Sequence, residues 1–100
     1  MSYDIFRNAI LNRQQVSCHY SGHDRLVCPH VIGTKSGRPQ VLTWQFAGGS
    51  SSGLPPGGQW RCMEISKISA VQAIDGPWHT GGAHTKPQTC VDQVDVEVAH

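Results

Sequence analysis

The chain has few charged residues and lacks a long apolar run. Asp, Glu, Lys and Arg make up 15% of its 100 residues, against about 25% in an average soluble protein. With 38% hydrophobic residues, this composition excludes disorder driven by charge repulsion. No apolar stretch reaches the ~18 residues of a membrane-spanning helix. The net charge of +1 also argues against the broad basic surface of a duplex-binding protein.

Sequence motifs for catalysis and metal binding are also missing. The chain has no G-x-S-x-G nucleophile elbow, and no lysine follows the glycine-rich run 48–53 to complete a P-loop. Its 4 cysteines (18, 28, 62 and 90) and 6 histidines lack the close-spaced pairs of zinc sites. We therefore predict a non-enzymatic protein with no catalytic residues, no cofactor and no metal site. A zinc-stabilised structural domain is kept as a third hypothesis.

The first residues, MSYDIFRNAILNR, argue against a signal peptide, because Asp4 and Arg7 interrupt the apolar residues. This predicts a cytoplasmic protein whose cysteines are mostly reduced thiols. In a secreted chain, four cysteines would allow three disulfide connectivities, and the sequence does not choose among them.

Hydrophobic periodicity predicts one helix followed by strands. Residues 2–14 read as a helix, with Ser2 as the N-cap and an apolar stripe of Ile5, Phe6, Ala9 and Ile10. From residue 16 the period becomes twofold, which indicates strands. The predicted strands cover 16–20, 26–32, 40–46, 59–65, 68–74 and 94–98, and the long irregular loops cover 47–58 and 75–90.

These elements predict one mainly β (α+β) domain over residues 1–100, an antiparallel sheet curled into a small barrel with a helix at one end. Pro29 predicts an irregular or edge position in the second strand. Leu42, Trp44 and Phe46 share one face of the third strand, and we assign Trp44 and Phe46 to the core.

Basic and aromatic residues supply a candidate binding surface. Small barrels commonly bind nucleotides or single strands on one sheet face, where aromatic rings stack and cations pair with phosphate. The alternative is that the rings fill the core and the cations are solvated. The charge is uneven along the chain: residues 1–67 carry 7 basic and 3 acidic residues, and residues 68–100 carry 1 and 4. A local basic surface is therefore compatible with a net charge near zero.

Residues 9–74 resemble the WYL domain, a bacterial regulatory module. The similar stretches are AILNRQQVSCHYSGHDRLVCPHVIG (9–33), TKSGRPQVLTWQF (34–46) and QWRCMEISKISAVQAI (59–74). Pro39, Gln40 and Val41 stand where the family has Trp-Tyr-Leu, and the chain looks like a compact relative without a helix-turn-helix domain. The resemblance implies an SH3-like or Sm-like barrel that senses nucleic acids or nucleotides. The residues that it places on the ligand-facing strands are Tyr20, Arg25, His30, Arg38 and Arg61.

We therefore predict a non-enzymatic ligand-binding domain that recognises a nucleotide or a short single-stranded nucleic acid. In this hypothesis Arg25, Arg38 and Arg61 pair with phosphate. Tyr20 and Trp60 offer rings for stacking, and no membrane partner is expected. The alternative is a protein-interaction module that docks a peptide or partner subunit through a strand edge or an aromatic surface.

Overall fold

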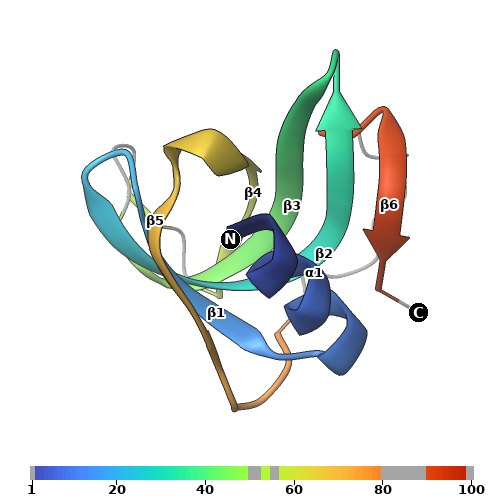
Figure 1. Cartoon of the computed structure of the whole chain (residues 1–100). Coiled ribbons are helices and arrows are strands. Elements are labelled where there is room, and N and C mark those ends of the chain that lie inside the picture. The colour runs from blue at the N-terminus through green and yellow to red at the C-terminus, as the bar shows by residue number, and fades with distance from the viewer. Residues whose placement is uncertain (1, 50–52, 55–56, 80–89, 99–100) are drawn as a thin grey trace.

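The computed structural model describes residues 2–49, 53–54, 57–79 and 90–98. It confirms the mainly β class with one N-terminal helix (Figure 1). The helix ends two residues earlier than expected. All six predicted strands are present, but β2 is three residues longer at each end than predicted and β3 is two residues longer at each end. The elements are α1 (Ser2–Asn12), β1 (Gln15–Tyr20), β2 (His23–Lys35), β3 (Arg38–Gly48), β4 (Gln59–Glu64), the 3-10 turn η1 (Ile65–Lys67), β5 (Ser69–Ile74) and β6 (Gln93–Glu97).

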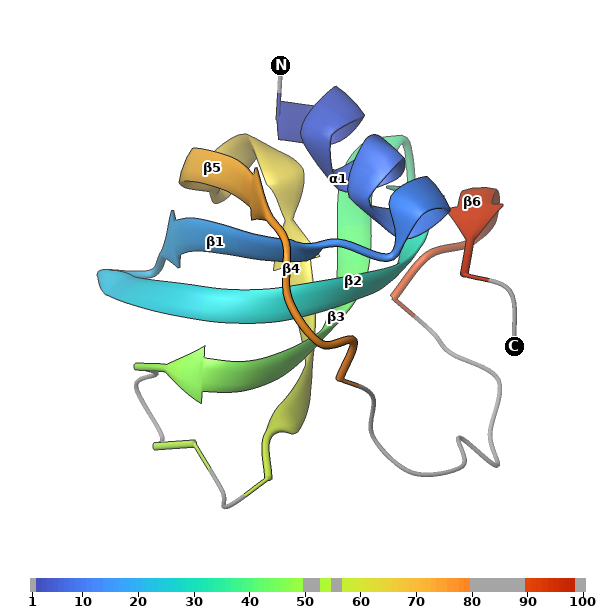
Figure 2. The same cartoon turned by 90° about the horizontal axis from the view of Figure 1, so that it is seen from below.

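The strands form one antiparallel sheet built around the long β2–β3 hairpin. The strand order is β4-β3-β2-β1-β5, and β6 pairs with β2. The first half of β2 pairs with β1, and its second half pairs with β6 (Figures 1 and 2). Among the described residues, no pairing joins the end strands β4 and β5, so closure into a barrel stays a prediction.

β2 is irregular at its proline, as the sequence predicts. The register between β2 and β3 shifts between Pro29 and Val31. At the same point β2 exchanges β1 for β6 as its neighbour, and the carbonyl oxygen of His30 accepts a hydrogen bond from the N–H of Val98 at 2.7 Å. A bulge of this kind bends a strand, which lets one strand serve two partners.

The main core lies between α1 and the inner face of the curled sheet (Figure 2). The predicted helical stripe supplies Phe6, Ala9 and Ile10, all buried. At the edge of α1, the Tyr3 hydroxyl donates to Asp95 Oδ2 at 2.6 Å, and Arg7 pairs with the same oxygen at 3.2 Å. Burial and the bond to Asp95 raise the pKa of Tyr3 to about 12. The helix is thus joined to the sheet by both apolar and polar contacts.

The assignment of Trp44 and Phe46 to the core is wrong for the main core. The inner face of β3 carries Val41, Thr43 and Gln45, each 0% exposed. Trp44 and Phe46 are half-buried on the outer face. β3 is buried on both sides because segments beyond β5 cross this outer face: His79 stacks on Phe46 at 4.2 Å between ring centroids. Twofold alternation does not show which face is covered.

The expectation that the cysteines are mostly reduced is wrong for one pair. Cys62 in β4 and Cys90 form a disulfide with a Cα–Cα distance of 5.6 Å, inside the range that a disulfide requires. Cys18 and Cys28 are free and buried. Because disulfides persist mainly in oxidising compartments, cytoplasmic localisation stays a prediction. None of the helices in the described residues has the length and apolarity needed to cross a membrane.

We predict that native protein at about pH 8 does not react with a thiol reagent. Burial raises the pKa of the Cys18 thiol to about 11 and also raises the pKa of Cys28, and the thiolate is the reactive form. Unfolding without a reductant should expose two thiols, and unfolding after reduction should expose four. A colorimetric thiol count checks this, and four thiols without reduction would contradict the disulfide.

Candidate functional site

A polar cluster occupies one end of the inner face, where the rest of that face is apolar. We call Tyr20, Arg25, Gln45 and Arg61 the inner arginine cluster. Residues directly opposite each other in an antiparallel pair face the same side. Arg25 pairs with the buried Cys18, and Arg61 pairs with the buried Thr43. Strand pairing therefore brings two arginines, 36 positions apart in the sequence, to the inner face.

Arg25 is the most confined member of the inner arginine cluster, with a residue exposure of 5%. Its Nε donates to the carbonyl oxygen of Tyr20 at 3.2 Å, and its Nη1 donates to Gln45 Oε1 at 3.1 Å. The Tyr20 ring lies 5.3 Å from the guanidinium carbon, in cation–π contact. Gln45 is itself fixed, because its Nε2 donates to the carbonyl oxygens of Ala47 and Gly49, both at 3.1 Å.

No carboxylate side chain balances the charge of Arg25. All 7 Asp and Glu residues of the chain lie within the described residues, and none forms an ion pair with Arg25. Burial lowers the pKa of Arg25, and the charge of Arg61 lowers it further. The like charges of Arg25 and Arg61 on the inner face therefore disfavour each other. A buried guanidinium that forms no ion pair, such as that of Arg25, costs free energy, so its position favours binding of an anion.

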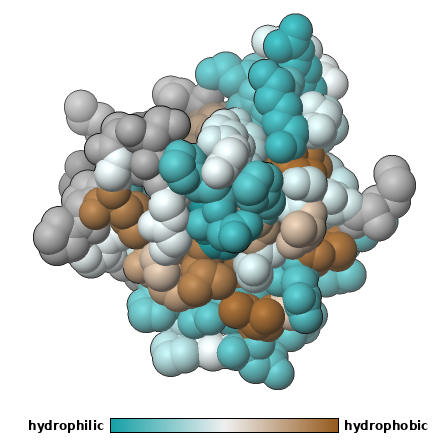
Figure 3. All heavy atoms as spheres, turned by 90° about the vertical axis from the view of Figure 1, so that its left-hand side faces the viewer, coloured by the Kyte–Doolittle hydropathy of each residue, from teal (hydrophilic) through white to brown (hydrophobic). Residues whose placement is uncertain are grey.

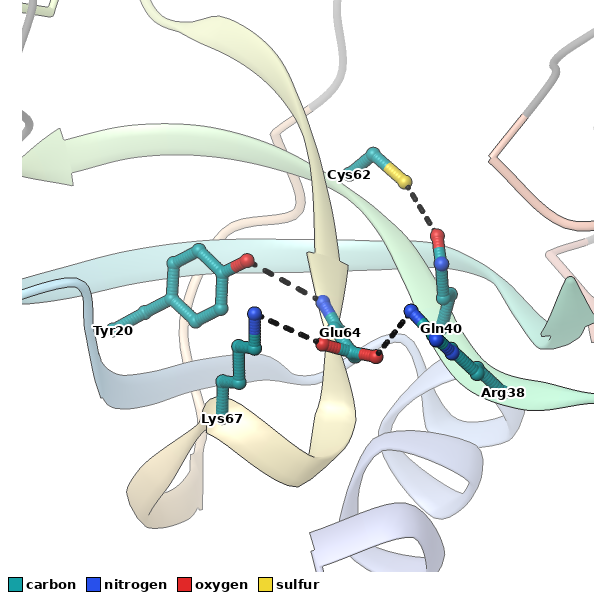
Figure 4. Close-up of polar contacts among 6 residues, drawn as sticks. All are labelled: Tyr20, Arg38, Gln40, Cys62, Glu64 and Lys67. Atoms are coloured by element: carbon teal, nitrogen blue, oxygen red, sulfur yellow. Dashed lines mark hydrogen bonds and ion pairs between the residues drawn. The ribbon is translucent and has the colours of Figure 1, made fainter.

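Arg38 is predicted to bind phosphate, but the structure pairs it with a carboxylate. Its Nη1 lies 3.9 Å from Glu64 Oε1, and Lys67 Nζ lies 3.3 Å from Glu64 Oε2 (Figure 4). The Arg38 side chain is 75% exposed, unlike Arg25. The backbone N–H of Glu64 donates to the Tyr20 hydroxyl at 3.5 Å. Arg38 is thus connected to Tyr20 only indirectly, through Glu64, and it does not belong to the inner arginine cluster.

Trp60 and His30 lie in a separate layer on the outer face. Trp60 precedes Arg61 in β4, and successive strand residues point to opposite faces. The ring centroid of Trp60 lies 4.8 Å from that of His30 and 5.2 Å from that of Trp44. His30 is 3% exposed, and its Nδ1 lies 2.7 Å from the Cys28 carbonyl oxygen. Because a carbonyl only accepts, Nδ1 carries the proton. Trp60, predicted to offer a stacking ring beside the arginines, therefore lies on the opposite face of the sheet from Arg25 and Arg61.

The structure adds one residue that the sequence does not reveal. Gln45 is 0% exposed and accepts a hydrogen bond from Arg25. In the sequence it stands between Trp44 and Phe46, where alternation suggests a solvent-facing polar residue. No local signal distinguishes a buried glutamine that orients an arginine from an exposed one.

A metal site finds no support in the described part of the chain. No group of three or more His, Cys, Asp or Glu side chains there is close enough together to hold an ion. The disulfide takes Cys62 and Cys90 out of the candidate zinc ligands. His84, another candidate in the sequence, lies outside the described residues.

No family model matches the chain, and no curated protein or solved structure matches it either. The resemblance to the WYL domain therefore stays a prediction. The function has to be argued from the inner arginine cluster itself.

Proposed function

We propose that this chain is a non-enzymatic binding domain for a small phosphate-bearing ligand, a nucleotide or a short single strand of nucleic acid. The observation that carries the proposal is Arg25, a 5% exposed cation that forms no ion pair with any acid of the chain. Arg61 adds a second guanidinium. The planar arginine side chain, with its several N–H donors, matches the geometry of phosphate as well as that of carboxylate.

The charge distribution supports a small ligand over a long one. Of the basic residues near the inner arginine cluster, Arg38 and Lys67 are already paired with Glu64. A long nucleic-acid strand that continued past Arg61 toward the end of β4 would approach the carboxylate of Glu64, which repels phosphate. The net charge of +1 likewise offers little sequence-independent attraction for a duplex.

The proposal predicts salt-sensitive binding that depends on Arg61. Fluorescence anisotropy with short labelled single strands, and calorimetry with a nucleoside monophosphate, should detect binding at about 50 mM salt that weakens at about 200 mM. Arg61→Ala should weaken it roughly tenfold or more, since a hydrogen bond to a charged group contributes about 1.5–3 kcal/mol.

Lys35→Ala is the matched control, because it also removes one positive charge but lies at the far end of β2 from Arg25. This variant should bind as the unchanged protein does. The absence of binding at low salt would overturn the proposal, and so would an equal loss in both variants, which would indicate attraction by net charge alone.

A second hypothesis is docking of a peptide along a strand edge, and the end strands β4 and β5 favour it. Figure 3 shows the side of the molecule that lies on the left in Figure 1. Its hydrophobic residues form small patches separated by hydrophilic ones, so this side offers little continuous apolar surface for a peptide. Peptide binding that is indifferent to salt and to Arg61→Ala would favour this hypothesis over phosphate binding.

A further inference from the structure

The two sulfur atoms of the Cys62–Cys90 disulfide differ in their access to solvent. Cys62 is exposed in the end strand β4, and its Sγ meets Gln40 Oε1 at the surface, at 3.1 Å (Figure 4). Cys90 is only 6% exposed, and it packs in a small apolar cluster with Leu42 and Val91. The bond thus joins a sulfur at the surface to a sulfur inside the fold.

This difference decides which sulfur an external thiol can attack. In thiol–disulfide exchange a thiolate approaches one sulfur along the S–S axis and displaces the other. The approach to the Cys62 sulfur comes from the exposed side of β4. The approach to the Cys90 sulfur would come from the opposite direction, through the apolar residues that bury it. Access therefore favours attack on Cys62, with Cys90 as the leaving thiolate.

The fold holds both cysteines in place without help from the bond between them. Cys62 lies in the part of β4 that is paired with β3. On the other side, Val91 is 4% exposed, and the N–H of Asp92 donates to the carbonyl oxygen of Thr34 at 2.9 Å. A Cys90 thiol released by exchange therefore stays opposite Cys62, and this close positioning gives it a high effective concentration for a return attack.

A neighbouring amide also accommodates the thiol form of the pair. Gln40 Oε1 lies 3.1 Å from Cys62 Sγ and 3.7 Å from Cys90 Sγ. The sulfurs of a disulfide carry no hydrogen, so this oxygen accepts no hydrogen bond from the bonded pair. Once the bond opens, a thiol can donate to the oxygen, although S–H is a weak donor. The open form thus gains a contact that the disulfide form lacks.

We propose that Cys62 is a site of reversible modification by small thiols such as glutathione, and that Cys90 is the resolving cysteine. The glutathione thiolate attacks Cys62 Sγ, a new sulfur–sulfur bond forms there, and the Cys62–Cys90 bond breaks. Cys90 leaves as a thiolate and takes a proton from water. In the return step the Cys90 thiolate attacks the mixed disulfide at Cys62 and expels the glutathione thiolate. Each step exchanges one disulfide for another, so neither needs a further oxidant or reductant.

The first test locates the adduct on the unchanged protein. The native full chain is incubated with excess reduced glutathione at about pH 8, where thiolate forms, stopped with acid and mapped by peptide mass spectrometry. We expect the mixed disulfide on Cys62 in roughly tenfold excess or more over Cys90. In urea, where both sulfurs are accessible, the two positions should carry similar amounts. An equal distribution in the native protein, an excess on Cys90, or no adduct at all would overturn the proposal.

Two single variants then test the two roles separately. With oxidised glutathione, native Cys90→Ser should form the mixed disulfide roughly tenfold faster or more than native Cys62→Ser, because Cys62 is the exposed member of the pair. Their rates should become similar in urea, and equal rates in the native state would contradict the site.

The resolving role of Cys90 has its own readout. After free glutathione is removed, the adduct should disappear from the unchanged protein and persist in Cys90→Ser, which lacks the thiol that expels it. Equal persistence in both would overturn this role. The mapping on the unchanged protein needs no variant to fold, and none of these outcomes depends on phosphate binding.

Discussion

Loss of the Cys62–Cys90 disulfide lowers the free energy of unfolding by about 3–4 kcal/mol. A cross-link restricts the unfolded chain, and the loop-closure entropy for a sequence separation of 28 gives a value of this size. The bond also joins β4 to the segment that leads into β6, on the side of the sheet where Val31, Leu42 and Trp60 pack. Urea unfolding of Cys62→Ala/Cys90→Ala, followed by tryptophan fluorescence, measures the loss.

The same variant supplies its own control. A reductant should lower the unfolding midpoint of the unchanged protein to that of the double variant and leave the double variant unaffected. A loss below about 1 kcal/mol, or an effect of reductant on the double variant, would contradict the prediction. Because the inner arginine cluster lies on the opposite face, phosphate binding should survive reduction at a temperature where the protein stays folded.

Phe6→Ala is expected to cost about 3–5 kcal/mol, the range measured for truncating a buried aromatic ring. Phe6 is 0% exposed and brings α1 onto the main core. Its removal leaves a cavity between the helix and the sheet that the surrounding strands fill only in part. A domain of this size has a total stability of about 5–15 kcal/mol, so the loss is a large part of the whole.

The matched control for Phe6→Ala is Leu11→Ala on the same helix. Leu11 is 58% exposed, so its truncation should change stability by no more than about 0.5 kcal/mol. Urea unfolding followed by circular dichroism compares the two variants. If Phe6→Ala fails to fold, Phe6→Leu should show an intermediate loss, because it removes less of the buried ring. Equal effects at positions 6 and 11 would contradict the packing of α1 on the sheet.

The local sequence pattern predicts the helix and the strands, and it also predicts some of the buried residues. The apolar stripe of residues 5–10 forms the buried face of α1, because helical spacing places Phe6, Ala9 and Ile10 on one side. Pro29 marks the irregular point of β2, since proline cannot donate to the sheet. These signals depend on neighbours in the chain, so one sequence suffices to read them.

The assembly of the site could be predicted only in part. Tyr20 contacts Arg25, and Arg61 points to the same inner face, but Arg38 pairs with Glu64 and Trp60 lies on the other face. Composition shows which residues could bind phosphate. It does not show that an acid from another strand has already neutralised one of them.

By itself, the sequence determined the class of fold, the order of its elements and the low charge that disfavours a duplex-binding surface, because periodicity and composition are local properties. Tertiary structure alone decided that both faces of β3 are covered, that Cys62 meets Cys90, and that a buried glutamine holds Arg25. Each of these depends on strand register and on segments that cross the sheet from distant parts of the chain. Long-range pairing therefore decides which of several plausible cations lies deep inside the fold without a counter-ion.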